Sequence, residues 1–144
     1  MKKIIGLLSF TILFNCCSVP VVFYLRNTTD TTKVIQVHLK NKNLQTYSLF
    51  YENKIFDPLK FKTFDDLNRK LSPFRKEDRK LFYRLPPKST FLIGRGINFK
   101  NFTFEQITIF DEDESSIELS LNDPNIFKSA KSPISRFYLW YDIE

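Results

Sequence analysis

The sequence has only two cysteines, one histidine and three glycines in 144 residues. Cys16 and Cys17 are neighbours, a poor arrangement for bonding to each other without strain, so a disulfide framework is excluded. His38 alone cannot supply a zinc cluster or a Ser-His-Asp relay whose other members can be named. Gly94 and Gly96 lack the further glycine and the lysine of a phosphate-binding loop. We therefore expect no metal, no cofactor and no catalytic residue.

The beginning of the chain has the pattern of an export signal. Lys2 and Lys3 form a positively charged segment, and an uncharged apolar run of eleven residues follows at 4–14. A membrane-spanning helix needs roughly 20 apolar residues, so this run is too short to be a permanent anchor. The pattern predicts a signal peptide over residues 1–15.

The end of the apolar run resembles the lipobox of bacterial lipoproteins. In that family a leucine precedes two small residues and an invariant cysteine, and here Leu13 stands three residues before Cys16. Phe14 and Asn15 are bulkier than the residues that the family has at those positions. The resemblance implies that signal peptidase removes the residues before Cys16 and that this cysteine carries the lipid attachment. Cys17 is the alternative attachment site.

Two other interpretations of this region remain open. An uncleaved N-terminal anchor would use the apolar residues 19–25 to lengthen the hydrophobic stretch, although Pro20 and the polar break at 15–18 argue against one continuous helix. An ordinary secretory peptide would leave both cysteines near the start of the mature chain. In the lipoprotein interpretation, residues 16–20 form a lipidated N-terminus with a short tether, and residues 21–144 form a single β-rich domain.

The expected mature chain has the size of one domain and a modest charge. Removing the signal peptide leaves 129 residues (144 − 15), enough to bury a hydrophobic core. The basic residues fall from 22 to 20 with the loss of Lys2 and Lys3, against 16 acidic residues, so the net charge is +4 (20 − 16).

Short segments of alternating apolar and polar residues recur along the expected domain. Ile35, Val37 and Leu39, for example, alternate with Gln36 and His38. The predicted strands are 21–25, 34–39, 46–51, 81–85, 89–93, 104–110, 117–121 and 136–143. In the last of these, one face is predicted to consist of Phe137, Leu139, Tyr141 and Ile143. This spacing predicts a mainly β fold, an antiparallel β-sandwich, immunoglobulin-like or similar, of about seven or eight short strands.

A short helical insertion is predicted near residues 63–80. Phe64, Leu67 and Leu71 recur at helical spacing, and Thr63 is a suitable N-cap. Pro73 would begin a second short helix at the position where its missing N–H costs nothing.

The same region is rich in basic and aromatic residues. Ten Lys or Arg and five acids lie within residues 54–84, an excess of five (10 − 5). The candidate binding surface consists of Arg69, Lys70, Arg75, Lys76, Arg79 and Lys80. An exported protein does not routinely meet nucleic acid, so we expect attraction to anionic head groups or to an acidic envelope protein. The alternative is a solvated insertion whose aromatic residues pack onto the sandwich.

The acidic turn at 111–116 resembles a calcium loop only in part. It has oxygen ligands at the first, third and fifth positions, but Ser116 replaces the glycine of the sharp turn, and Asn122 replaces the bidentate glutamate. A solvated hairpin tip is the better interpretation.

Two classes of function remain. The leader favours a non-enzymatic lipoprotein tethered to the bacterial envelope, at the outer membrane rather than the inner, whose β domain binds or scaffolds a partner. An inhibitor or immunity-type protein that binds a protein partner belongs to this class. The second class, a small envelope hydrolase, would need a nucleophile with a base, and the sequence has no recognisable arrangement of these.

Overall fold

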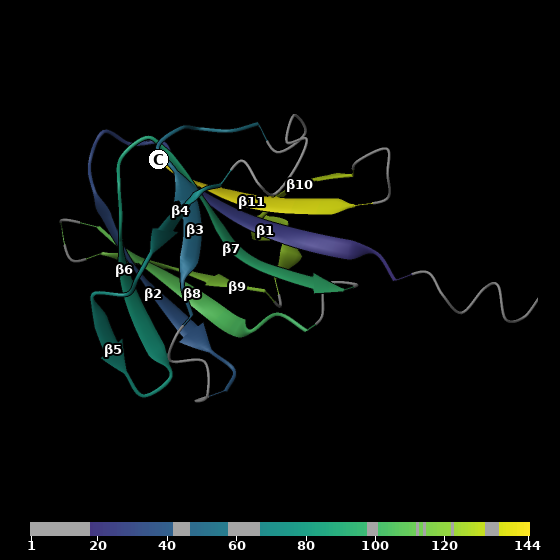
Figure 1. The fold of residues 1–144 in the computed structure, drawn as a ribbon, viewed down its shortest axis with the longest axis horizontal. Coiled ribbons are helices and arrows are strands. Elements are labelled where there is room, and N and C mark those ends of the chain that lie inside the picture. Colours follow the sequence, from purple (N-terminus) through teal and green to yellow (C-terminus); the bar gives the residue numbers. More distant parts are fainter. Residues whose placement is uncertain are drawn as a thin grey trace, which may run out of the picture.

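The computed structural model describes residues 18–41, 47–57, 67–97, 101–111, 113, 115–121, 123–131 and 136–144. The predicted signal peptide, Cys16 and Cys17 lie outside these residues. Within them the chain forms two packed sheets (Figure 1), which confirms the mainly β sandwich. The described residues include no helix long and apolar enough to cross a membrane.

The described part of the chain contains eleven strands and one short 3-10 helix. In chain order these are β1 (Pro20–Asn27), β2 (Lys33–Leu39), β3 (Leu49–Glu52), β4 (Arg69–Leu71), β5 (Arg75–Glu77), β6 (Lys80–Leu85), β7 (Ser89–Ile97), β8 (Phe104–Phe110), β9 (Ser116–Ser120), η4 (Pro124–Ile126), β10 (Lys128–Lys131) and β11 (Phe137–Ile143). The six-stranded sheet has the order β10-β11-β1-β7-β3-β4, and the five-stranded sheet has the order β5-β6-β2-β8-β9. The prediction of seven or eight strands was too low because β4, β5 and β10 have only three or four residues each, too few to show an alternating pattern.

The six-stranded sheet is mixed rather than wholly antiparallel. β1 and β11 pair in parallel, with Val21 opposite Phe137 and Asn27 opposite Ile143. Parallel neighbours need a long crossover connection, and here the intervening chain, which includes the whole five-stranded sheet, supplies it. The first and last described strands therefore lie side by side, and the expectation of a purely antiparallel sandwich is corrected.

The core between the sheets is formed by alternate residues of the facing strands. Val21, Phe23 and Leu25 of β1 are buried against residues from the facing sheet, such as Ile35 of β2. The Phe23 ring lies 4.9 Å from that of Phe127 and 5.7 Å from that of Phe104, measured between centroids. Fully burying each such side chain contributes about 1.5–3 kcal/mol.

Gly94 permits the close approach of β7 to this aromatic core. A Cβ atom at this position would lie 2.7 Å from the Phe104 ring and 3.3 Å from the Phe102 ring. The glycine at 94 is thus explained by packing rather than by ligand binding.

A second, smaller apolar cluster lies on the outer face of the six-stranded sheet. Its buried members are Val22, Tyr24, Leu67, Leu92 and Tyr138. The segment 53–57 is held across this face, because the Phe56 N–H donates to Thr90 Oγ1 at 3.0 Å and that hydroxyl donates to the Lys54 carbonyl at 2.8 Å. The sheet is consequently packed on both faces in this region.

The predicted helical insertion is wrong for its described part, residues 67–80, and residues 63–66 lie outside the description. This part of the chain forms the edge strands β4 and β5. Leu67 belongs to the outer cluster, whereas Leu71 packs against the core between the sheets. The two leucines therefore do not share the single apolar stripe that a helix would require.

Candidate functional site

The predicted lipid attachment site lies just before the described chain. Three residues separate Cys16 from Pro20, where β1 begins. A fully extended chain advances about 3.5 Å per residue, so an acyl group on Cys16 would hold the first residue of β1 within roughly 14 Å of the membrane. In Figure 1 this end of β1 lies on the opposite side of the molecule from the C-terminus.

The six predicted basic residues lie along the edges of the two sheets and in the turn that leads into β6. Arg69 and Lys70 lie on β4, the edge strand of the six-stranded sheet, and Arg75 and Lys76 lie on β5, the edge strand of the five-stranded sheet. Arg79 and Lys80 follow at the turn into β6 and at its first residue.

Acidic neighbours reduce the positive charge of this region. Arg69 lies 3.3 Å from Glu52, Arg75 lies 3.1 Å from Glu77, and Arg79 lies 3.9 Å from Glu105, each measured between side-chain nitrogen and oxygen. Short, charged edge strands also discourage pairing with the edges of other sheets. Protection of the edges is therefore a structural role for these residues.

Aromatic rings and arginines form a cluster beside these edges. The Arg75 guanidinium lies 3.8 Å from the centroid of the Phe82 ring, and the Arg84 guanidinium lies 4.0 Å from that of Phe74. Phe74 is 44% exposed. We call Phe74, Arg75, Phe82 and Arg84 the Arg–Phe cluster. Arginines and exposed aromatic side chains are typical anchors of protein interfaces.

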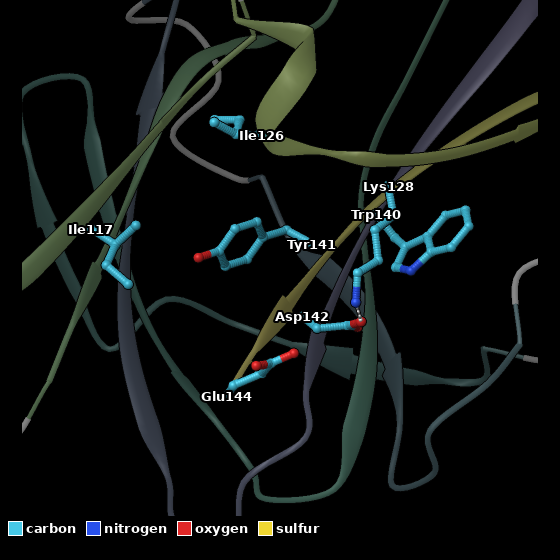
Figure 2. Close-up of a pocket in the computed structure, with 7 residues that line it drawn as sticks. All are labelled: Ile117, Ile126, Lys128, Trp140, Tyr141, Asp142 and Glu144. Atoms are coloured by element: carbon cyan, nitrogen blue, oxygen red, sulfur yellow. Dashed lines mark hydrogen bonds and ion pairs between the residues drawn. The ribbon is translucent and has the colours of Figure 1, made fainter.

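A hollow of about 270 Å³ opens beside β11 (Figure 2). Its lining residues are Ile117, Ile126, Lys128, Trp140, Tyr141, Asp142 and Glu144. Figure 2 shows the Tyr141 phenol directed toward Ile117 and the Lys128 amine directed to Asp142. The hollow is slightly smaller than the roughly 300–1,000 Å³ of typical small-molecule sites.

Asp142 is the centre of an ion-pair network at this hollow. Its Oδ1 accepts from Arg26 Nε at 2.5 Å, and its Oδ2 accepts from Arg26 Nη2 at 2.8 Å and from Lys128 Nζ at 2.7 Å. The remaining Arg26 Nη1 donates to the Phe56 carbonyl at 2.8 Å. The carboxylate thus joins β1, β10 and β11 to the segment that covers the outer face.

These contacts decide the protonation of the network. Burial alone would raise the pKa of Asp142, but the hydrogen bonds from Arg26 and Lys128 outweigh it and hold that pKa below its usual range. The same carboxylate raises the pKa of Lys128. Asp142 is accordingly an ionised acceptor with both oxygens engaged, which makes it unsuitable as a general acid.

Trp140 lies next to this network on the outer face. The Arg26 guanidinium is 5.7 Å from the centroid of its ring, and within the described chain its buried indole Nε1 has no hydrogen-bond partner. The alternating pattern predicted the face formed by Phe137, Leu139, Tyr141 and Ile143, but no role was predicted for Trp140 and Asp142, which alternate with them. The sequence does contain one signal for this network: an acidic residue lies two positions after a tryptophan, on the outward side of an apolar strand.

The buried tyrosines between the sheets have structural roles. Tyr83 donates to the Tyr47 carbonyl at 2.7 Å, and Tyr47 donates to the Ile93 carbonyl. Burial raises the pKa of both phenols, and the phenols therefore stay neutral donors at physiological pH.

The acidic turn and the histidine are engaged in local contacts. Asp111 pairs with Lys33 at 2.5 Å, and Asp113 Oδ1 accepts from the hydroxyl of Ser115 at 2.6 Å, which lowers the pKa of Asp113. His38 Nδ1 lies 3.4 Å from Glu105. Among the described residues, no group of three or more His, Cys, Asp or Glu side chains could hold a metal ion.

Comparisons of the chain with protein-family models, with curated proteins and with solved structures find no match.

Proposed function

We propose that this protein is a lipoprotein of the bacterial envelope, anchored in the outer membrane through Cys16, with a non-enzymatic binding or scaffolding role. The observation that carries this proposal is the position of the fold relative to the leader. All described strands lie within residues 20–143, so cleavage before Cys16 would remove none of them. Only three residues would separate the acylated cysteine from β1.

The chemistry of acylation suits such an anchor. Each buried methylene of an acyl chain contributes about 0.8 kcal/mol of membrane affinity, and two or more chains give stable attachment. The domain would then be held at the bilayer without a membrane-spanning segment.

The Arg–Phe cluster supports a protein partner for the anchored domain. Phe74 exposes 44% of its surface, and two arginines stack on the rings of this cluster. Such a surface suits an inhibitor or immunity-type protein that binds an acidic protein. The hollow at β11 supports a hydrolase less well, because Asp142, one of its two carboxylates, is held by Arg26 and Lys128.

The anchor is tested by substituting each cysteine in the full chain. We expect the Cys16→Ser variant to remain unprocessed and to lack acyl chains, whereas the matched Cys17→Ser variant is processed like the parent. Mass spectrometry of the N-terminal peptide from membrane-extracted protein measures both properties. An intact Met1 or an unmodified Cys16 in the parent protein would contradict the proposal.

The binding role is tested with two exposed phenylalanines. Phe74 is 44% exposed beside the edge of the five-stranded sheet, and Phe50 is 46% exposed on β3 of the other sheet. We expect Phe74→Ala to reduce capture of a partner from envelope extract about tenfold, since an interface anchor contributes 1–2 kcal/mol or more. Phe50→Ala should leave capture unchanged. Equal capture by both variants would remove the Arg–Phe cluster as the binding surface.

A further inference from the structure

We propose that the end of the sandwich where β1 begins rests on the anionic phospholipid head groups of the leaflet that holds the anchor. This inference rests on the proposed function and adds the orientation of the domain to it. The surface in contact is the membrane-facing end, which we define as Lys40, Arg95, Ile97, Lys131 and Arg136.

Strand pairing places these residues around the first residue of β1. Pro20 pairs with Ile97, and Val22, two residues further along β1, pairs with Arg95. On the other side of β1, Val21 pairs with Phe137, which in turn pairs with Lys131 of β10. Figure 1 shows the start of β1 and the end of β7 on the same side of the molecule.

The five-stranded sheet adds a further cation to this end. The Lys40 N–H donates to the Thr103 carbonyl at 2.9 Å. The next residue, Phe104, begins β8, and its ring lies against Gly94 near the end of β7. Lys40 therefore follows the end of β2, next to the chain that enters β8.

The membrane-facing end combines positive charge with an exposed apolar residue. Lys40, Arg95 and Lys131 are exposed, Arg136 is partly exposed, and Ile97 is 47% exposed. Described acids also lie near this end: Glu105, which pairs with His38 and Arg79, Asp123, which follows β9, and Asp78, which precedes Arg79, whose carbonyl accepts from the Leu39 N–H. The four cations would be attracted to anionic head groups, and the exposed isoleucine side chain would insert between these head groups.

The opposite end of the domain has the reverse balance of charge. The acids Asp30, Asp111, Asp113 and Glu144 lie in the turns or after the strands at that end. Two of its lysines are paired with acids, Lys33 with Asp111 and Lys88 with Asp30. The domain is therefore polarised along β1, and the short tether from Cys16 emerges from the positive end.

This assignment differs from the surface predicted from sequence. Arg69, Lys70 and Arg75 lie along the edges of the sheets, and two of them are paired with acids. A tether of roughly 14 Å keeps the start of β1 close to the membrane. A domain that rests on this end does not also place the sheet edges on the membrane. The edges thus remain open to a protein partner.

The experiment compares two isoleucines of similar exposure at opposite ends of the domain. Ile97 is 47% exposed at the membrane-facing end, and Ile117 is 41% exposed on β9 at the hollow. Each is replaced singly, Ile97→Cys or Ile117→Cys, in the full chain carrying Cys17→Ser. The processed protein is purified in detergent and reconstituted into vesicles of phosphatidylglycerol with phosphatidylcholine, or of phosphatidylcholine alone. An uncharged polymer-linked maleimide then measures how fast each thiol reacts.

We expect the thiol at position 97 to react about fivefold or more slowly in the anionic vesicles than in detergent, and the thiol at position 117 to react equally in both. The double substitution Arg95→Glu/Lys131→Glu should remove the protection, and the charge-matched Lys70→Glu/Lys88→Glu should keep it. About 1 M salt should also weaken the protection, because the screening length falls to roughly 3 Å.

The outcomes separate this inference from the proposed function. A purified protein without acyl chains overturns the anchor and the orientation together. An acylated protein in which both thiols react alike in anionic vesicles overturns the orientation alone. Protection that survives the Arg95→Glu/Lys131→Glu substitution overturns the assignment to anionic head groups.

Discussion

The outer faces of the two sheets differ in what covers them. On the six-stranded sheet, Tyr24 and Val22 are each 1% exposed beneath a cluster that includes Leu67 and Phe56. On the five-stranded sheet, the matching central strand β2 presents Gln36 and His38, which remain partly exposed. One outer face behaves as a second core, whereas the central strand of the other presents polar residues.

The sequence of each strand reflects this difference. Residues 21–25 of β1 are a continuous apolar run, which is typical of a strand buried on both faces, whereas β2 alternates. The length of an apolar run thus indicates whether the outer face of a strand is covered.

The outward residues of the two central strands should differ most in their contribution to stability. We expect Tyr24→Ala to lower the free energy of unfolding by about 3–5 kcal/mol, because it opens a cavity among Val22, Leu92 and Tyr138. Gln36→Ala should change it by no more than about 0.5 kcal/mol. Urea denaturation monitored by tryptophan fluorescence measures both. Similar losses of stability in the two variants would contradict the difference between the two outer faces.

The ion pairs of the two sheets should also differ. Asp142 is 8% exposed and holds two cations, whereas Arg75 and Glu77 are 54% and 55% exposed. We expect Asp142→Ala to destabilise the protein by about 3 kcal/mol, because the partly buried Arg26 loses its partner. Glu77→Ala should cost less than about 1 kcal/mol. Denaturation midpoints compare the two, and equal losses would contradict a structural role for the network.

The lowered pKa of Asp142 predicts how stability depends on pH. A carboxyl group whose pKa is lower in the folded state than in the unfolded state stabilises the fold when the pH is above the unfolded-state pKa, about 3.9. This stabilisation is lost as the pH falls through the folded-state pKa. We expect the stability difference between the parent and Asp142→Asn to be full at pH 6 and to shrink below about pH 4. Urea titrations at several pH values measure it, with Glu77→Gln as the control for losing a carboxylate. A difference that stays constant down to pH 2 would contradict the assigned contacts.

The smallest effect on stability is expected at the charged edges. Replacing Lys70 on β4 and Lys76 on β5 by valine should change the free energy of unfolding by about 0.5 kcal/mol or less. The same double variant should self-associate faster, because uncharged edge strands pair with one another. Light scattering against concentration measures this, with Gln36→Val on the interior strand β2 as the control. Equal scattering by both proteins would leave edge protection unsupported.

Local sequence patterns predicted the strands in which apolar inward residues alternate with more polar outward residues. The expected strand at 136–143 corresponds to β11, and its predicted inward residues Phe137, Leu139, Tyr141 and Ile143 all pack against the core between the sheets. The alternating run at 34–39 lies within β2. The short edge strands escaped prediction because charged residues occupy most of their positions. Their strand conformation comes from pairing with a neighbour.

The candidate sites were harder to predict from the sequence than the strands were. Arg26 and Asp142 are 116 positions apart, and no local pattern relates them. Only the parallel pairing of β1 with β11 brings the two side chains opposite each other. Similarly, the basic residues of 69–80 form a group in sequence, but the change of sheet after β4 distributes them over two edges.

Local sequence patterns were sufficient to predict the mainly β class and the inward residues of the longer strands, because the pleat of a strand imposes a period of two on its residues. The sequence also carries the leader pattern on which the proposed anchor depends. Four features are visible only in the folded domain: the parallel pair, the second apolar cluster, the Asp142 network and the separation of charge along β1. These depend on which distant strands become neighbours, and that choice follows from the packing free energy of the whole domain rather than from any one segment.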